Sequence, residues 1–373
     1  MVTIAIPKEI FAGERRVAAT PETITKIVHH GFSIAVEKGA GLLSSFSDEE
    51  YKAAGAEVKS EVLSDADVIL SVNPPAKHHK HQLELVKNGA IWISLFVPQA
   101  EPELIELAAK RSVTLFSLNL LPRISRAQRM DALTSQSNIS GYKAVLLAAN
   151  VLGKIFPLMM TAAGTIQPAR VVVLGAGVAG LQAIATAKRL GARVEASDIR
   201  REAKEQVESL GASFIDPPAE EGSMQDEKGY AKEVTKDFLK RQQEEVAKRI
   251  KQADVVITTA LVPGRKAPIL ITKDVVKEMK RGAVIIDMAA AAGGNCEETA
   301  PGKTIDKDGV MIIGESNIPS LIAHNASQLY SRNILHFFEG MIKEKKIHLQ
   351  LDDQIYKDTL VTHDGKIMFG EKK

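Results

Sequence analysis

Residues 175–180 read Gly-Ala-Gly-Val-Ala-Gly and are the clearest sign of chemistry in this chain of 373 residues. The preceding run at 170–174 is rich in valine and predicts a buried strand, and the pattern at 181–190 predicts a helix. A second predicted strand then leads to Asp198, 18 residues beyond Gly180. Strand, glycine loop, helix and acidic residue in this order are typical of a dinucleotide-binding βαβ unit.

Each glycine of this loop has its own physical role in binding a dinucleotide. Gly175 permits a tight turn, Gly177 lets the backbone approach a pyrophosphate, and Gly180 allows close packing of helix on strand. The helix start adds amide donors and the positive end of the helix dipole. Asp198 would accept hydrogen bonds from ribose hydroxyls and repel a 2′-phosphate, which favours NAD over NADP, although the arginines at 200–201 weaken that preference. The alternative interpretation is a structural glycine turn with an unrelated aspartate.

A second segment, residues 121–134, is dense in polar side chains. Within it, Arg123, Gln128, Asp131 and Thr134 are spaced so that they can form a cluster that binds a carboxamide and a ribose. An ion pair between Arg123 and Asp131 that caps the following helix explains the same spacing equally well. The sequence leaves both interpretations open.

The sequence offers no convincing group for proton transfer. Oxidation of an alcohol or an amine moves a proton as well as a hydride, and therefore needs a general acid or base beside the substrate. His78, His79 and His81 lie among lysines in a predicted surface loop, and the histidines at 29–30 are predicted to end a helix. The sequence contains no HExxH, paired CxxC, G-x-S-x-G or P-loop motif, so we expect no metal site and no hydrolase or NTPase activity.

The elements around these segments predict an α/β fold, because short apolar runs alternate with amphipathic helical patterns in both halves. The polar segment 216–230 interrupts the pattern and predicts a mobile loop or a lid, and residues 232–251 predict a solvated amphipathic helix. The predicted strands are residues 3–7, 32–36, 67–72, 90–95, 114–118, 170–174, 193–196, 254–259, 283–287 and 310–313.

The length suggests about two domains. We place the first at residues 1–134 plus 320–373 and the second, which carries the glycine loop, at residues 135–319. The expected architecture is two doubly wound Rossmann-like domains, the first discontinuous, with a nucleotide cleft between them.

Composition excludes several classes of protein. Lys and Arg number 48 against 46 Asp and Glu, so no strong basic field points to nucleic acid. A single cysteine, Cys296, excludes a disulfide framework and fits a reducing compartment. The most apolar long window, 144–164, is interrupted by Lys154 and Pro157, so no membrane span is predicted, and the N-terminal residues do not resemble a secretion signal.

Several segments in order along almost the whole chain match one known family. They are residues 122–131, 159–165, 175–198, 204–211, 229–233 and 257–261. Together these segments resemble the NAD(H)-binding alpha subunits of proton-translocating NAD(P) transhydrogenases.

The resemblance implies direct hydride transfer from NADH on this subunit to NADP on an NADP(H)-binding partner subunit. It also implies that separate transmembrane subunits move the protons, that the chain forms a homodimer, and that it is cytoplasmic and lies at the cytoplasmic face of the inner membrane through its partners. Transfer between two nicotinamides requires orientation but no acid or base at the hydride site, which agrees with the residues.

The resemblance also implies roles for individual residues. Arg123, Gln128, Asp131 and Thr134 would form the catalytic loop at the nicotinamide, with Gln128 reaching toward the second nucleotide, and Tyr230 would belong to a mobile loop. The implied NAD(H) contacts are Gln128, Arg129, Met130, Asp131, Gly175, Gly177, Val178, Ala179, Gly180, Asp198, Ile199, Arg200, Gly229, Tyr230, Gln242, Ala260 and Leu261.

Alanine dehydrogenases are similar as well, with the same fold and a similar N-terminal segment. That family handles its amino acid with a Lys and a His, and the corresponding positions here are Asn73 and Phe96. Arg16 matches its carboxylate-binding arginine, although an arginine retained there can serve packing instead. An alanine-type dehydrogenase and a non-catalytic NAD-binding module are therefore the alternatives to a transhydrogenase subunit.

Two positions depart from the transhydrogenase pattern. Thr134 stands where a serine is usual, and the hydroxyl is kept. Ala291 stands where we expect a glutamate, so nucleotide affinity or pH response could differ from that of the family.

Overall fold

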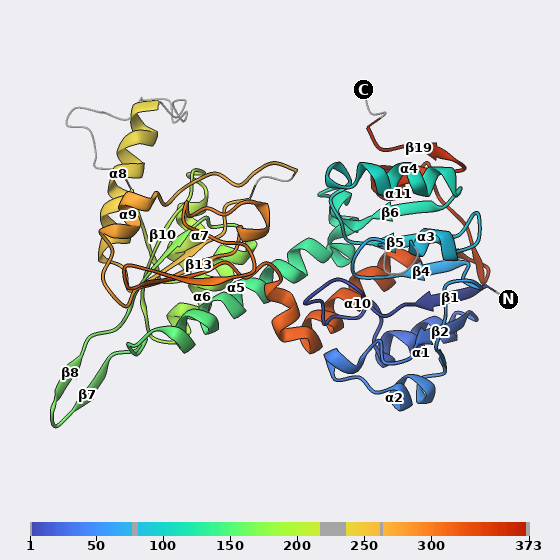
Figure 1. The fold of residues 1–373 in the computed structure, drawn as a ribbon, viewed down its shortest axis with the longest axis horizontal. Coiled ribbons are helices and arrows are strands. Elements are labelled where there is room, and N and C mark those ends of the chain that lie inside the picture. Colours follow the sequence, from blue (N-terminus) through green and yellow to red (C-terminus); the bar gives the residue numbers. More distant parts are fainter. Residues whose placement is uncertain (1, 77–80, 217–235, 262–263, 371–373) are drawn as a thin grey trace. The chain divides into compact units, whose positions relative to one another are not determined.

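The computed structural model describes residues 2–76, 81–216, 236–261 and 264–370. The chain divides into two compact units, the first formed by Met1–Ile139 with Pro319–Lys373 and the second by Ser140–Ile318. Helix α5 (Ala132–Val151) runs through the first point of division. Each unit is built on its own sheet (Figure 1).

The first unit holds an eight-stranded sheet in the order β19-β18-β6-β5-β4-β1-β2-β3. Strands β1 to β6 are parallel, and β18 and β19 are antiparallel additions at one edge. The strands are β1 (Thr3–Ile6), β2 (Ser33–Glu37), β3 (Glu57–Lys59), β4 (Val68–Leu70), β5 (Ile91–Ser94), β6 (Thr114–Ser117), β18 (Leu360–His363) and β19 (Lys366–Ile367).

Both faces of this sheet are covered, which explains its continuously apolar strands. Successive residues of β1 point to opposite faces: Ile4 and Ile6 belong to one core cluster and Ala5 to another. The first cluster includes residues of α1 and α10, and the second includes residues of α3 and α4. The helices of this unit are α1 (Pro21–His29), α2 (Asp48–Ala53), α3 (Gln82–Leu85), α4 (Pro102–Lys110), α10 (Ala323–Glu339) and α11 (Gln354–Thr359).

The second unit holds a seven-stranded sheet in the order β11-β10-β9-β12-β13-β15-β14, parallel except for β14. The chain builds outward from β9 on one side and then from β12 on the other, so the strand order reverses between these two neighbours. The strands are β9 (Arg170–Leu174), β10 (Arg193–Ser197), β11 (Ser213–Phe214), β12 (Val255–Thr258), β13 (Val284–Asp287), β14 (Thr304–Lys307) and β15 (Val310–Ile313). Besides α5, the helices are α6 (Val178–Arg189), α7 (Ala203–Ser209), α8 (Lys236–Gln252) and α9 (Lys273–Lys277).

Two small hairpins lie outside the sheets. One pairs β16 (Ile342–Lys343) with β17 (Lys346–Ile347). The other pairs β7 (Met159–Thr161) with β8 (Gly164–Ile166) and extends away from the sheet of the second unit (Figure 1). All six residues of β7 and β8 are exposed.

The predicted α/β fold class with two parallel, Rossmann-like sheets is confirmed, and each predicted strand overlaps an observed one. The missed strands lie mainly at sheet edges; β3 and β14, for example, are short and polar and contain no buried residue, so they have no apolar run. The predicted helix at 232–251 corresponds to α8, whose preceding residues lie outside the described part. Among the described residues, no helix is long and apolar enough to cross a membrane.

Candidate dinucleotide site

The glycine loop lies at the carboxyl end of β9, where the strand order reverses. This position is where open parallel sheets bind ligands. Gly175 has a φ of +98°, and a Cβ there would lie 2.5 Å from Oγ1 of Thr259, in the segment that follows β12. A Cβ on Gly180 would collide with the carbonyl oxygen of Gly175. Only glycine fits at these two positions without a shift of the backbone.

Gly177 differs from the other two glycines because its surroundings are open. A Cβ there would have no atom within 4 Å, and the residue is the N-cap of α6. Among the described residues, no side-chain hydrogen bond caps the start of α6, so the amide groups there can serve an anion. The loop therefore combines tight packing on the strand side with room for a pyrophosphate on the helix side.

Asp198 follows β10 and is charged. Its carboxylate accepts hydrogen bonds from the backbone N–H groups of Ala176 (2.7 Å) and Arg200 (2.9 Å). It also pairs with the Arg200 guanidinium through Nε and Nη2, both at 3.0 Å. Burial raises the pKa of Asp198, but the hydrogen bonds from Arg200 and Ala176 outweigh burial and hold it below its usual value.

The Asp198 side chain is only 8% exposed, whereas that of Arg200 is 56% exposed. The guanidinium therefore covers the acid, and a ribose that reaches Asp198 has to share it with Arg200 or displace Arg200. The family resemblance implied a nucleotide contact at Arg200, and neither the resemblance nor the residue pattern gave any sign of this pairing.

Three large apolar side chains are exposed along the same carboxyl edge of the sheet. Val178 begins α6, Ile199 follows β10 and Leu261 follows β12. Their exposed fractions are 39%, 76% and 54%. Exposed apolar groups beside a phosphate-binding loop are suited to contact the flat faces of a nucleotide.

Gln242 in α8 is buried and turned toward the end of β10. Its amide donates to the backbone carbonyl of Asp198 at 3.2 Å and to Oγ of Ser197 at 3.5 Å. The side chain therefore holds the segment that carries the acid. Gly229 and Tyr230, which the resemblance places at the nucleotide, lie outside the described residues.

The polar segment at 121–134 belongs to the first unit and is held by contacts with the core and with α10. Its 3-10 helix η4 (Ser125–Met130) contains buried Ala127, and the Arg129 carbonyl accepts a hydrogen bond from Nδ2 of Asn333 in α10 (2.9 Å). Arg123, Gln128 and Arg129 are exposed, while Met130 packs on the core. The segment thus exposes polar side chains, and its backbone is hydrogen-bonded to α10.

Asp131 begins α5 and caps it. Its carboxylate accepts bonds from the backbone N–H of Thr134 (2.9 Å) and from Oγ1 of Thr134 (2.6 Å). In the part of the chain that the structure describes, no ion pair joins Arg123 to Asp131, so that half of the structural interpretation is wrong. Asp131 does cap the helix, through the N–H and the hydroxyl of Thr134, and the Arg123 side chain is exposed.

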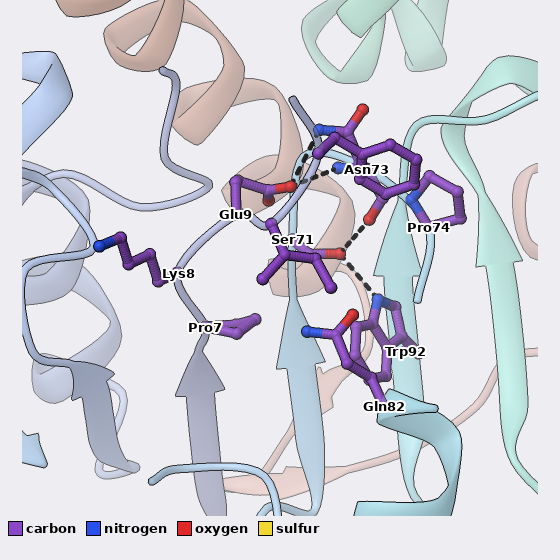
Figure 2. A pocket seen from close by; sticks show the side chains of 10 residues that line it. Pro7, Lys8, Glu9, Ser71, Asn73, Pro74, Gln82 and Trp92 are labelled. Atoms are coloured by element: carbon purple, nitrogen blue, oxygen red, sulfur yellow. Dashed lines mark hydrogen bonds between the residues drawn. The ribbon is translucent and has the colours of Figure 1, made fainter. Parts of the chain in front are cut away.

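The first unit has its own point of strand reversal, between β1 and β4, and a small pocket lies there (Figure 2). Glu9 accepts hydrogen bonds from the N–H of Val72 (2.6 Å) and from Nδ2 of Asn73 (2.9 Å). Burial raises the pKa of Glu9 to about 7 despite these bonds. Asn73 Nδ2 also donates to Glu14, at 3.0 Å, so one amide bridges two carboxylates.

The side chain of Arg16, which matches the carboxylate-binding arginine of alanine dehydrogenases, is hydrogen-bonded to residues of its own chain. Its Nε and Nη2 bind the two oxygens of Glu14 at 2.8 and 2.7 Å, and Nη1 binds Oε1 of Gln136 at 2.9 Å. Arg16 is 7% exposed and Phe96 is buried to the same degree. Arg16 thus neutralises a buried carboxylate of its own chain.

The remaining candidates have structural roles or lie outside the described residues. His81 caps α3 by accepting a hydrogen bond from the N–H of Leu83 (3.2 Å), while His78 and His79 are not described. Among the described residues, no group of three or more His, Cys, Asp or Glu could hold a metal ion. Sequence reasoning missed Asp287 and Asn295, two buried polar residues. Asn295 donates a hydrogen bond to Ala260, which lies next to the glycine loop. The one sign of them in the sequence was an aspartate at the end of a predicted buried strand.

The second unit thus has the strand order, glycine turn and acidic residue of a dinucleotide-binding α/β protein. Two family models cover almost the whole chain: the alanine dehydrogenase/PNT N-terminal domain matches residues 5–140 and the C-terminal domain matches residues 144–370. The chain belongs to the alanine dehydrogenase/PNT family.

Individual relatives agree with this assignment. The chain is 47% identical over 373 residues to an NAD(P) transhydrogenase alpha subunit of Rhodospirillum rubrum, covering 98% of this chain and 97% of that protein. The crystal structure of transhydrogenase from Sinorhizobium meliloti matches with a TM-score of 0.89 at 43% identity, covering 98% and 99% of the two chains. An L-alanine dehydrogenase matches with a TM-score of 0.80 at 26% identity, covering 98% and 96%. The resemblance to transhydrogenase alpha subunits, with alanine dehydrogenases as more distant relatives, is confirmed.

Proposed function

We propose that this chain is the NAD(H)-binding subunit of a proton-translocating NAD(P) transhydrogenase. It transfers a hydride directly between NADH bound here and NADP+ on a partner subunit, and separate transmembrane subunits move the protons. The relatives named as transhydrogenases and the glycine loop support this proposal.

NAD(H) fits the residues of the second unit. The open space at Gly177 and the uncapped start of α6 suit a pyrophosphate, and charged Asp198 suits ribose hydroxyls. The family resemblance implies that Gln128, Asp131 and Thr134 would act at the nicotinamide end. A bound nicotinamide would supply the hydride, and the residues of this chain would orient it.

The choice of function rests on one observation: the Arg16 guanidinium is already occupied by the Glu14 carboxylate. An amino-acid dehydrogenase would need this guanidinium to hold the substrate carboxylate, and here a substrate would have to displace a buried carboxylate bound through two hydrogen bonds. Asn73 and Phe96 cannot exchange a proton at neutral pH. Two nicotinamides in contact need only proximity and orientation, which such a chain can supply.

We further propose that the chain is a homodimer, that it works only within the complex, and that it lies at the cytoplasmic face of the inner membrane through its partners. The β7–β8 hairpin supports self-association, because a two-stranded hairpin is marginal on its own and exposes Met160 (75%) and Ile166 (46%). Light scattering of the chain, with and without residues 159–166, tests the dimer.

A mixed assay tests the function. The chain, an NADP(H)-binding partner domain, NADH and an NADP+ analogue should together produce the reduced analogue. The chain alone with alanine and NAD+ should produce no NADH, and production would favour the dehydrogenase alternative. Binding of both nucleotides without any transfer would leave only a non-catalytic NAD-binding module.

A further inference from the structure

Asp287, at the end of β13, is a buried carboxylate at the centre of a hydrogen-bond cluster. It is 0% exposed. Its two oxygens accept five bonds, and all but one of the donors lie in the loop that follows β13. The donors are Thr258 Oγ1 (3.0 Å), the N–H groups of Ala289 (3.0 Å), Asn295 (2.8 Å) and Cys296 (3.0 Å), and Thr299 Oγ1 (2.6 Å).

The loop closes tightly around this carboxylate. Gly294 has a φ of +81°, and a Cβ there would lie 2.8 Å from Oδ2 of Asp287. Two of the five donors are the neighbouring N–H groups of Asn295 and Cys296, so the cluster holds the backbone at Asn295 in place.

Asn295 is also 0% exposed, and its amide reaches the segment that follows β12. Oδ1 accepts from the N–H of Ala260 at 3.1 Å, and Nδ2 donates to the carbonyl of Ala260 at 2.9 Å. A third bond runs from Nδ2 to the carbonyl of Pro268 at 2.8 Å. One side chain therefore satisfies both backbone groups of Ala260, just beyond the point where the ladder of β12 ends.

The segment held in this way touches the glycine loop. Thr259, the neighbour of Ala260, donates from Oγ1 to the carbonyl of Gly175 at 3.0 Å. Leu261, on the other side, is 54% exposed at the carboxyl edge of the sheet. Hydrogen bonds thus link Asp287 to Asn295 and Asn295 to Ala260, and the adjacent residue Thr259 bonds to the glycine loop.

We propose that Asn295, held by Asp287, is a positioning residue for the dinucleotide. It acts through Ala260, keeps the 259–261 segment against the glycine loop, and so determines the affinity for NAD(H). This inference rests on the proposed nucleotide binding of the second unit. Without the amide, two backbone groups of Ala260 lose their partners and the segment is free to leave the glycine loop.

The test compares Asn295→Ala with the wild-type chain in NADH titrations followed by fluorescence. We expect the dissociation constant to rise at least tenfold at a temperature where the variant is folded by circular dichroism, and the Ala260 amide to exchange with solvent faster. Thr362→Val is the matched control, since it removes an equally buried bond, to the Val113 carbonyl (2.7 Å), in the first unit. It should lower Tm without changing NADH affinity.

Folded Asn295→Ala with wild-type NADH affinity would overturn the inference, whatever its Tm. If that variant does not fold, Asn295→Asp replaces it, because a neutral carboxyl can still accept and donate while a charged one cannot donate. NADH affinity should then be weakened and fall as pH rises; wild-type affinity at every pH would contradict the role. A wild-type chain that binds no NADH would instead refute the proposed function.

Discussion

The two units share the order of their six parallel strands, but different kinds of residues lie at the point where that order reverses. Between β9 and β12, the glycine loop leaves open space at Gly177 and an uncapped helix start. Between β1 and β4, the corresponding position is filled by Glu9 and Asn73, which hydrogen-bond to each other. The same topology therefore leaves room for a ligand in one unit and holds a polar cluster that bonds to itself in the other, so the fold alone does not determine function.

This contrast predicts that changes in the first unit's cluster alter stability, whereas changes in the second unit's loop alter NADH affinity. The largest effect is expected for Arg16→Met. It leaves the Glu14 carboxylate buried without its cation, which costs about 3–5 kcal/mol of unfolding free energy. Urea unfolding measures this loss. Arg126→Met, which breaks the exposed pair with Asp353, is the control and should change stability little.

Glu9→Gln should remove a pH dependence of stability. The pKa of Glu9 is raised from 4.5 to about 7 in the folded chain, so the unfolded chain releases this proton first as pH rises. Wild-type stability therefore falls relative to the variant between pH 4.5 and 7, by at most about 3 kcal/mol, and the difference stays constant above pH 7. A difference in unfolding free energy between the two proteins that stays the same from pH 4.5 to 7 would contradict the raised pKa of Glu9.

Asp198→Ala should weaken NADH binding by about 2 kcal/mol, because hydrogen bonds to a charged acceptor are lost. It should also reduce discrimination against NADPH, since the negative charge that opposes a 2′-phosphate is gone. Titrations with both nucleotides measure the ratio. An unchanged ratio would remove the assigned role, and Asp198→Asn separates loss of charge from loss of the side chain.

Gly177→Ala should have the smallest effect on folding and a selective effect on binding. Its Cβ meets no atom within 4 Å, so Tm should stay near the wild-type value, while the methyl group occupies space needed by a pyrophosphate. We expect about a tenfold loss of NADH affinity, which corresponds to about 1.4 kcal/mol. Wild-type affinity in this variant would place the phosphates elsewhere.

The glycine loop of the second unit was predictable from the sequence, and the polar cluster of the first unit was not. Buried parallel strands such as β9 and β12 are continuous apolar runs, and the glycine spacing with Asp198 indicated the nucleotide loop. Edge strands such as β14 have no such run and were missed. Residue spacing does not show which side chains meet in three dimensions. The ion pair between Arg16 and Glu14 and the hydrogen bonds from Asn295 to Ala260 therefore could not be predicted.

Direct hydride transfer is the central claim, and isotope tracing tests it most directly. The chain and its NADP(H)-binding partner receive NADH labelled with deuterium at the transferred position, together with NADP+, in ordinary water. Direct transfer predicts NADPH that retains the label in full, as shown by mass spectrometry. NADPH carrying hydrogen from solvent, or no NADPH while both nucleotides are bound, would contradict it.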